Sequence, residues 1–468
     1  MRCCIEGARR RWMGWGWVLL ILLFGVGCDA PPKTPAALDL PVYFTADING
    51  RLVPCGCFSG QHGGMTRLRT VLEAEANAAG LRVDVGDALS GTADFEVIQY
   101  RYQLQAFGDL HYDALNLGHR EAGLSAAQLR ELAGKSPVPL VSANLLDAAT
   151  RQPVVAPYRI VERGGFKIAV IGVLDAVGLE DRLGSGLVVE PMESALGVLL
   201  PKVRPQVDLI VLLAFTDEPG MARLAQQFYE LNVILGGRVR QPAQELKREN
   251  RSVIYFTTNE SRALGFLGLL LKGPSDFSVQ GNEIRLLHDR IPEAAAVVAL
   301  AKAYRAEVRT ARLALDDPER LQADQVPGVR TAASYVGSES CLTCHPEAAA
   351  KWKDSGHAHA FETLARVDAD ADPRCLSCHT VGFGTPSGYR RELGAARLTQ
   401  VGCESCHGPG SLHVRQYQGD TSVSFKVRPL GEGDCRKCHY GEFSRPFDWA
   451  TFWPKVAHGT KAVPPAQP

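Results

Sequence analysis

The pattern C-x-x-C-H occurs four times between residues 341 and 439 and constrains this chain more than any other feature. In each copy two thiols lie one helical turn apart. This spacing lets both form thioether bonds to the vinyl groups of one haem, and the histidine that follows can bind the iron. Zinc also binds paired C-x-x-C thiolates, but it does not need a histidine directly after every pair. The sequence therefore predicts four covalently attached c-type haems (heme c). The attachment residues are Cys341, Cys344, His345, Cys375, Cys378, His379, Cys403, Cys406, His407, Cys435, Cys438 and His439.

Six-coordinate haem iron needs a second axial ligand, usually Met or His. The last methionine is Met221, so histidine is the expected distal ligand, and bis-histidine ligation implies a low potential. His357 and His359 cannot both serve one haem from a helix, because a two-residue step turns the side chain to nearly the opposite face. If both are ligands, every iron can have two histidines; if only one is, one haem has an open or weakly held position. The distal candidates are His357, His359, His413 and His458.

Residues around these motifs resemble the tetrahaem cytochrome c-554 family. The similar stretches are Y-V-G-S at 335–338, W-x-x-S-x-H-A-H-A-F at 352–361, C-H-G-P-G-S-x-H at 406–413 and W-P-K-V-A-H-G at 453–459. The resemblance implies a mainly α multihaem cytochrome c domain, predicted over residues 334–460, in which closely spaced haems pass electrons. It also implies three bis-histidine haems and one haem without a strong distal ligand. The distal ligands would then be His357 (or His359), His413 and His458.

The N-terminus has the form of an export signal. Arginines at 9–11 precede a short apolar stretch from Trp12 to Gly27, which is too short to span a membrane comfortably. It resembles a bacterial lipoprotein signal peptide over residues 1–27, with Cys28 as the lipidation site. Gly25 departs from the leucine that this family prefers, so an uncleaved anchor stays open as an alternative. Residues 28–40 are predicted to be a Pro- and Ala-rich linker.

Short apolar runs alternate with helical stretches over residues 41–290, which predicts an α/β domain with sheet at its centre. The expected strands are 42–44, 81–84, 113–117, 139–142, 167–171, 208–213 and 232–235, and the expected helices include 65–79 and 220–230. Residues at the strand ends resemble the calcineurin-like metallophosphoesterases, particularly the 5′-nucleotidase branch. They are D-I-N-G at 47–50, G-D at 86–87, G-H-R-E at 118–121, S-A-N at 142–144 and G-G-R-V-R at 236–240. The resemblance implies a metallophosphoesterase-like sandwich domain.

Most metal ligands of that family are replaced in this sequence. Asp47 and Asp87 match, but the positions of other family ligands hold Asn49, His119, Arg120, Phe215, Arg238 and Arg240. Arginine does not release its proton to bind a metal, and phenylalanine has no donor atom. We therefore expect no dinuclear metal site and no hydrolysis of phosphoesters. The arginines could instead bind an oxyanion or form ordinary ion pairs.

Three further segments complete the chain. Cys55-Gly-Cys57 follows the first strand and could be redox-active, bind a soft metal or be inert. Residues 291–333 are predicted to be a helical connector, and residues 461–468 a disordered tail.

These features predict an exported electron-transfer protein, lipid-anchored on the periplasmic side of a bacterial membrane. Its expected partners are redox proteins or a quinone-linked donor. Lys plus Arg and Asp plus Glu are both 51, so the charge does not indicate nucleic acid. One alternative is an oxidoreductase that acts on a small nitrogen or sulfur oxyanion, at an open haem or at the Cys55/Cys57 loop. A second is a metal-dependent phosphoester hydrolase.

Overall fold

A computed structural model describes residues 37–54, 60–75, 80–258, 260–317, 333–392, 394–426, 429–441 and 446–459. The predicted signal peptide with Cys28, the pair Cys55 and Cys57, and the tail 461–468 lie outside the described residues. Residues 35–468 form one compact unit.

The first part of the chain contains a mixed six-stranded sheet in the order β14-β13-β1-β2-β3-β4. Four strands are parallel: β1 (Leu38–Thr45), β2 (Leu81–Asp84), β3 (Ala114–Asn116) and β4 (Leu140–Val141). The long hairpin of β13 (Ala263–Gly273) and β14 (Asp276–Leu286) pairs antiparallel with β1. Neither strand of this hairpin was among those predicted from the sequence.

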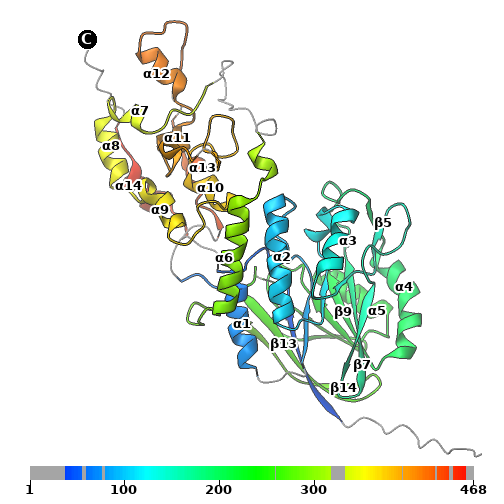
Figure 1. Cartoon of the computed structure of the whole chain (residues 1–468). Coiled ribbons are helices and arrows are strands. Elements are labelled where there is room, and N and C mark those ends of the chain that lie inside the picture. Colours follow the sequence, from blue (N-terminus) through cyan, green and yellow to red (C-terminus); the bar gives the residue numbers. More distant parts are fainter. Residues whose placement is uncertain are drawn as a thin grey trace, which may run out of the picture. The chain divides into compact units, whose positions relative to one another are not determined.

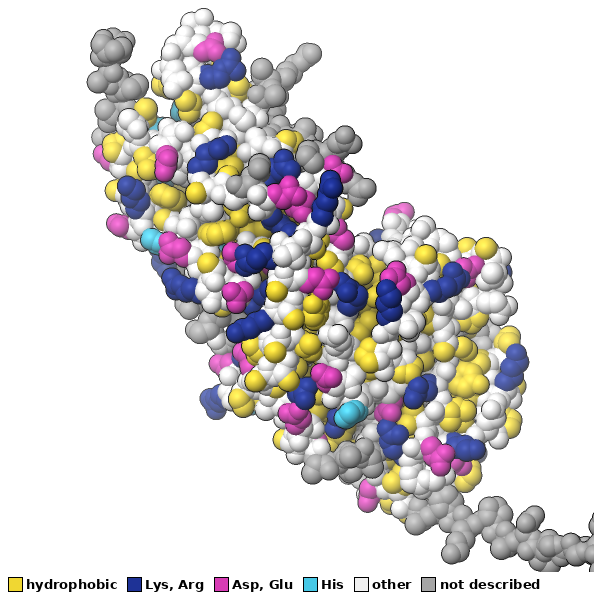
Figure 2. All heavy atoms as spheres, viewed as in Figure 1, with side chains coloured by type: hydrophobic (Ala, Val, Ile, Leu, Met, Phe, Trp, Pro, Cys, Tyr) yellow, Lys and Arg dark blue, Asp and Glu magenta, His cyan; other side chains and the backbone are white. Residues whose placement is uncertain are grey.

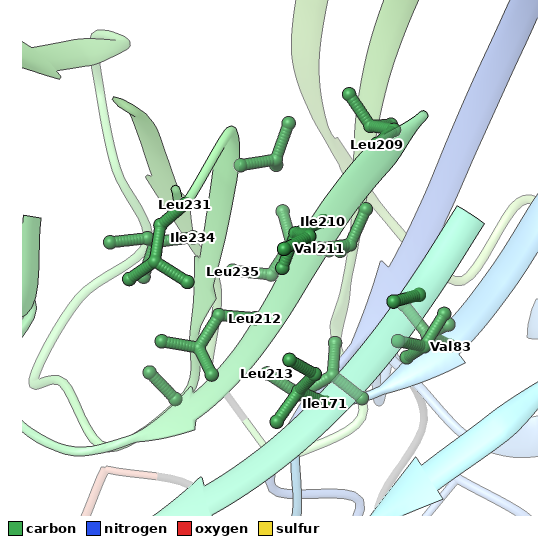
Figure 3. Close-up of a cluster of buried hydrophobic side chains, with 14 of the residues drawn as sticks. Val83, Ile171, Leu209, Ile210, Val211, Leu212, Leu213, Leu231, Ile234 and Leu235 are labelled. Atoms are coloured by element: carbon green, nitrogen blue, oxygen red, sulfur yellow. The ribbon is translucent and has the colours of Figure 1, made fainter. Parts of the chain in front are cut away.

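A second six-stranded sheet has the order β11-β12-β10-β9-β7-β6. Its parallel centre contains β7 (Phe166–Leu174), β9 (Leu209–Phe215), β10 (Val233–Gly236) and β12 (Ser252–Phe256). The antiparallel edges are β6 (Tyr158–Arg163) and β11 (Lys247–Glu249). Strands β5 (Leu145–Asp147) and β8 (Leu187–Val189) form a separate pair. All residues of β9 are buried, as expected for a strand covered on both faces, and Figure 3 shows its side chains among Ile171, Ile234 and Leu235.

Alternation along the strands places the two sheets face to face. Leu40, Val42 and Phe44 of β1 belong to a core shared with the second sheet, whereas Tyr43 packs in a different core with helices. That helical layer contains α1 (Met65–Ala74), α2 (Asp94–Asp109), α3 (Ala126–Lys135) and α6 (Ala295–Thr310). The opposite layer contains α4 (Met192–Val203) and α5 (Glu218–Gln227). The result is a helix–sheet–sheet–helix sandwich, with these elements labelled in Figure 1.

The C-terminal part is built from short helices, coloured yellow to red in Figure 1. They are α7 (Glu339–Leu342), α8 (Pro346–Lys353), α9 (Ala360–Ala365), α10 (Pro373–His379), α11 (Cys403–His407), α12 (Ser411–Tyr417), α13 (Glu432–Cys435) and α14 (Trp449–Val456). Single 3₁₀ turns span Glu121–Gly123, Arg204–Gln206, Ala314–Asp316, Gly356–His359 and Ala396–Leu398. The apolar clusters in this part are small, such as Ala333 with Leu412 and Phe425.

Acidic and basic side chains are interspersed on the face that Figure 2 shows. Among the described residues, no helix combines the length and the apolar character needed to cross a bilayer.

A buried amide joins the two sheets. Asn116, which is 2% exposed at the end of β3, donates from Nδ2 to the carbonyl oxygens of Val85 (2.9 Å), Val173 (2.9 Å) and Leu213 (3.2 Å). Val173 and Leu213 belong to β7 and β9 of the second sheet, so this side chain bonds across the sandwich.

Replacing Asn116 with Ala should destabilise the sandwich. The variant leaves buried carbonyl groups without this donor, so we expect the free energy of unfolding to fall by about 1–3 kcal/mol. Urea unfolding followed by far-ultraviolet circular dichroism measures the change. Gln280→Ala on the exposed face of β14 is the control and should change stability by less than about 0.5 kcal/mol. Equal midpoints for the two variants would contradict the role assigned to Asn116.

Candidate functional site

A cavity of about 2360 Å³ is lined by all twelve residues of the four C-x-x-C-H motifs and, on one side, by residues of the first domain that include 49–54 and Gln99. Ordinary ligand pockets have volumes of roughly 300–1,000 Å³, so this cavity has room for several large groups. His357, His413 and His458 also line it, whereas His359 does not. The eight motif cysteines are partly buried at its wall.

Short helices present the motifs to the cavity. Helix α10 begins at Pro373, where the side chain of Asp372 accepts a hydrogen bond from the backbone N–H of Arg374 and caps the helix. Helix α11 ends after His407 at Gly408, whose φ of 81° suits a residue without a side chain. Helices α10 and α11 contain both cysteines of their motifs, and residues three apart on one helical face can reach the same group. In the first and fourth motifs the helix ends earlier, but the histidine N–H still donates to the carbonyl oxygen of the first cysteine, which closes one helical turn.

Three motif histidines face three of the distal candidates. The ring centres lie 6.1 Å apart for His345 and His413, 6.0 Å for His439 and His357, and 5.8 Å for His407 and His458. Two imidazoles that bind one metal ion at about 2 Å each have nitrogens about 4 Å apart and ring centres roughly 6 Å apart. The donor set therefore fits iron bound between each pair. Burial lowers the pKa of His357, His413 and His439, which favours the neutral imidazole that binds metals.

His357 and His359 lie in different surroundings on the turn Gly356–His359. His357 faces the cavity, whereas His359 has an exposed side chain whose Nδ1 lies 3.4 Å from Glu362 Oε1. Of the two candidates, only His357 lines the cavity and faces a motif histidine. The remaining motif histidine is His379, from the second motif. Its Nδ1 lies 2.6 Å from the carbonyl oxygen of Ala360. Such a contact orients the imidazole ring of a histidine that binds a metal.

Contacts between motif cysteines give the order of the four attachment sites in space. The Cys341 thiol lies against Cys403, and Cys378 lies against Cys438. Cys435 is close enough to Cys406 to contribute to raising the pKa of the Cys406 thiol, after the larger effect of burial. The sites therefore follow one another in the order of His345, His407, His439 and His379.

Glu404 is a site residue that the sequence analysis missed. This side chain, 3% exposed, lies between the two cysteines of the third motif and accepts hydrogen bonds from the backbone N–H groups of Gly337 (2.7 Å), Gly410 (2.7 Å) and Val336 (3.0 Å). It thus joins the Y-V-G-S stretch to α11. The one feature of the sequence that could have indicated this role is the position of Glu404 directly after Cys403, inside a C-x-x-C-H motif.

Strand ends of the first domain form a second candidate site, at the positions that correspond to metal ligands of the phosphoesterase family. The guanidinium of Arg120 lies 2.7 Å from Asp47 Oδ1 and 3.7 Å from Asp87 Oδ2. Asp47, Asn49 and Asp87 have φ values of 54°, 52° and 59°, a strained region for such residues that is typical of functional sites. The two aspartates thus bind a guanidinium group across the site.

The remaining positions also lie at this site. Arg238 is 3.4 Å from Asp175 Oδ2, and His119 Nε2 lies 2.7 Å from the carbonyl oxygen of Asp175. The ring of Phe215 contacts His119 edge to face, and Arg240 is exposed. Among the described residues, no group of three or more His, Cys, Asp or Glu side chains is arranged to hold a metal ion. Arg120 and Arg238 therefore form ion pairs, one of the two roles considered for them.

The C-terminal motifs agree with comparison to known proteins. Residues 340–408 match the family model described as cytochrome c554 and c-prime. Cytochrome c-554 of Nitrosomonas europaea is 41% identical over 103 residues, which cover 19% of this chain and 42% of that protein. The C-terminal region matches the cytochrome c554 family. This similarity implies covalently bound c-type haems in the region.

The first domain is similar to 5′-nucleotidases. That of Vibrio cholerae is 26% identical over 245 residues, covering 46% of this chain and 43% of that protein. The structure of a 5′-nucleotidase precursor from Thermus thermophilus has a TM-score of 0.52 at 20% identity, covering 58% of this chain and 59% of that chain. The sulfate thiohydrolase SoxB of Thermus thermophilus has a TM-score of 0.50 at 18% identity, covering 63% of each chain.

Both parts of the predicted fold class are confirmed: an α/β calcineurin-like phosphoesterase fold with mixed sheets, followed by a cytochrome c554 region. The chain spans less than half the length of the two curated relatives.

The site formed by Asp47, Asp87 and Arg120 should make stability depend on pH. Burial raises the pKa of Asp87 to about 7, and the charge of Glu121 adds to this, while Arg120 opposes it. An aspartate in the unfolded chain has a pKa of about 3.9. The folded state therefore gains stability from the protonated Asp87 carboxyl; this contribution is complete below that pH and is lost as the pH rises to about 7. We expect Asp87→Asn to flatten the decline in unfolding free energy over this interval.

Urea unfolding at several pH values measures the slope. Asp181→Asn, at an exposed position, is the control and should keep the wild-type slope. Identical slopes for Asp87→Asn and the wild type would show that Asp87 does not cause the decline.

Proposed function

We propose that this protein is an exported multihaem c-type cytochrome that transfers electrons through four covalently bound haems. The observation that carries this assignment is the set of three histidine pairs with ring centres 5.8–6.1 Å apart in a cavity lined by four C-x-x-C-H motifs. Bound haem supplies one-electron chemistry at iron, and the protein fixes spacing, burial and axial ligation.

The chain's histidines would hold the irons in two ways. His345, His407 and His439 are assigned as proximal ligands with His413, His458 and His357 opposite them. His379 is assigned to the haem at Cys375 and Cys378. We propose that its distal side differs from the others, because three distal candidates face other motif histidines and His359 is exposed. This division agrees with the resemblance to the tetrahaem family.

Electrons would pass along the order of the attachment sites. Cysteine contacts join the His345 site to the His407 site and the His439 site to the His379 site, and the Cys406–Cys435 neighbours connect the two pairs. The His345 and His379 sites are thus the ends of the series. A redox protein or a quinone-linked donor would deliver electrons at one end.

Export follows from the chemistry of haem attachment, which takes place outside the cytoplasm. We propose a periplasmic location on a bacterial membrane, with Cys28 as the lipid-anchored residue. The basic segment, the short apolar stretch and the small residues before Cys28 support this location.

The first domain is proposed to have lost phosphoester hydrolysis. Arg120 pairs with Asp47 and Asp87, two carboxylates that would have to bind metal in a working hydrolase. A fixed guanidinium between them opposes the binding of a divalent cation at the same place. The domain would then be a scaffold for the haem region.

A second candidate function is reduction or oxidation of a small nitrogen or sulfur oxyanion at the haem of His379. Exposure of His359 favours it, since this residue then leaves the distal side of a haem available. A high-spin signal that shifts on adding nitrite, sulfite or nitric oxide would support this function.

The distal assignments are tested by a neighbouring pair of variants. In the mature protein, pyridine haemochrome absorbance should give four haems per chain, and electron paramagnetic resonance during a redox titration should show low-spin bis-histidine haems. We expect His357→Ala to convert one low-spin haem to high-spin, because it removes an axial ligand. His359→Ala, two residues away, should leave the spectrum unchanged. The opposite pattern would overturn the assignment, and the absence of a Soret band would overturn the function.

Metal content and hydrolysis test the first domain. We expect the mature protein to contain iron but no stoichiometric manganese or zinc, and to hydrolyse neither 5′-AMP nor p-nitrophenyl phosphate when either metal is added. Elemental analysis and a phosphate-release assay measure these quantities. Stoichiometric metal with turnover that is lost in Asp47→Ala would establish the hydrolase instead.

A further inference from the structure

Helix α6 packs against the helical layer of the first domain. Its Glu307 accepts a hydrogen bond from the hydroxyl of Tyr102 on α2 at 2.9 Å. The rings of Tyr102 and Tyr304 also meet edge to face, with centres 6.3 Å apart. Figure 1 shows α2 and α6 side by side. These contacts make α6 part of the phosphoesterase-like domain.

The same helix binds the segment that leads into the second haem motif. Arg309 donates to the carboxylate of Asp370 at 3.0 Å, and Arg305 donates to the carbonyl oxygen of Val367 at 2.6 Å. From the other direction, Arg391 donates to a backbone carbonyl near the end of α6. The segment before α10 is therefore held by α6 at several points.

Tyr304 makes the most buried of these contacts. It is 2% exposed and its hydroxyl donates to Oδ2 of Asp372, which is 3% exposed, at 3.1 Å. Burial raises the pKa of Tyr304, so the phenol keeps its proton and acts as the donor. Asp372 also caps α10 and lies 3.3 Å from the guanidinium of Arg374. All three side chains line the cavity, and Tyr304 and Arg374 both lie near Cys375.

We propose that Tyr304 is a positioning residue for the haem attached at Cys375, Cys378 and His379, and that it couples the first domain to the potential of this one haem through Asp372. The inference rests on the proposed function, because it requires a haem at this motif. The hydroxyl that donates to Asp372 belongs to α6, the helix that packs on the first domain.

Charge near the attachment helix gives the expected signs. Reduction adds one electron to the iron, so a nearby negative charge disfavours it and a nearby positive charge favours it. The hydroxyl of Tyr304 and the guanidinium of Arg374 offset the carboxylate of Asp372. Removing the hydroxyl leaves this carboxylate less compensated, so the potential should fall. Removing the carboxylate's charge leaves Arg374 uncompensated in a buried place, so the potential should rise.

The test uses mature, full-length protein with its haems attached. Spectroelectrochemical titration resolves the one-electron components of the wild type, Tyr304→Phe, Asp372→Asn and the control Tyr102→Phe. We expect Tyr304→Phe to lower the midpoint of one component and Asp372→Asn to raise the midpoint of the same component. Asparagine can still cap α10, so its charge is the main change. Tyr102→Phe removes a different hydroxyl, the one that donates to Glu307 of α6, and keeps the ring that contacts Tyr304. Because Tyr102 lies outside the cavity lining, this variant should leave every midpoint unchanged.

The outcomes separate this inference from the proposed function. Shifts of the same sign in Tyr304→Phe and Asp372→Asn, equal shifts in all components, or no shift in either variant would overturn the role of Tyr304. If Asp372→Asn fails to mature, Tyr304→Phe against Tyr102→Phe still decides the question. Mass spectrometry of the peptide that contains Cys375 and Cys378 tests the foundation, because this peptide without covalent haem would overturn the proposed function itself.

Discussion

Facing imidazoles held about 6 Å apart are the constraint on which the C-terminal region depends. His357 comes from a turn between α8 and α9, yet its partner His439 follows α13, and His413 of α12 faces His345 of the first motif. Each pair thus joins parts of the chain that are far apart in sequence. The apolar clusters in this region are small compared with the two cores of the first domain. Ligation and contact with a large apolar group would therefore contribute much of the order that side-chain packing contributes elsewhere.

The first domain has the fold of a phosphoesterase, with an arginine beside two carboxylates at its strand ends. Asp47, Asn49 and Asp87 retain left-handed φ angles at the strand ends, although arginine now lies between the two carboxylates. Glu121 accepts hydrogen bonds from the backbone N–H groups of Asp87, Leu89 and Gly118, which fixes the loops around this position. An ion pair can thus replace a metal as the group that balances clustered carboxylates. The strained geometry is preserved because the surrounding hydrogen bonds determine it.

The sequence could predict those features that depend on residues close together in the chain. Haem attachment needs two thiols and a histidine within five residues, so the motifs alone are enough to predict Cys341 and its equivalents as attachment residues. The parallel strands β7 and β9 follow from their continuous apolar runs. Contacts between residues far apart in the chain could not be predicted. The two-residue spacing of His357 and His359 shows that their side chains point in different directions, but it does not show which of them faces the cavity. Tyr304 looked like one more residue of an amphipathic helix, because its acceptor, Asp372, lies in another part of the chain. The β13–β14 hairpin was also missed, since exposed β14 has no continuous apolar run.

Helix α6 explains why the two parts of this chain can work as one protein. A linker that only tethers two domains would leave their redox and packing properties independent. Here the connector contains a helix whose one side packs on α2 and whose other side binds Asp370 and Asp372, immediately before the second haem motif. Any shift of α6 relative to the sandwich would therefore reach the N-terminus of α10, since buried hydrogen bonds are costly to break. Under the proposed function, the phosphoesterase-like fold would then have a physical use as a rigid support for one end of the series of C-x-x-C-H sites.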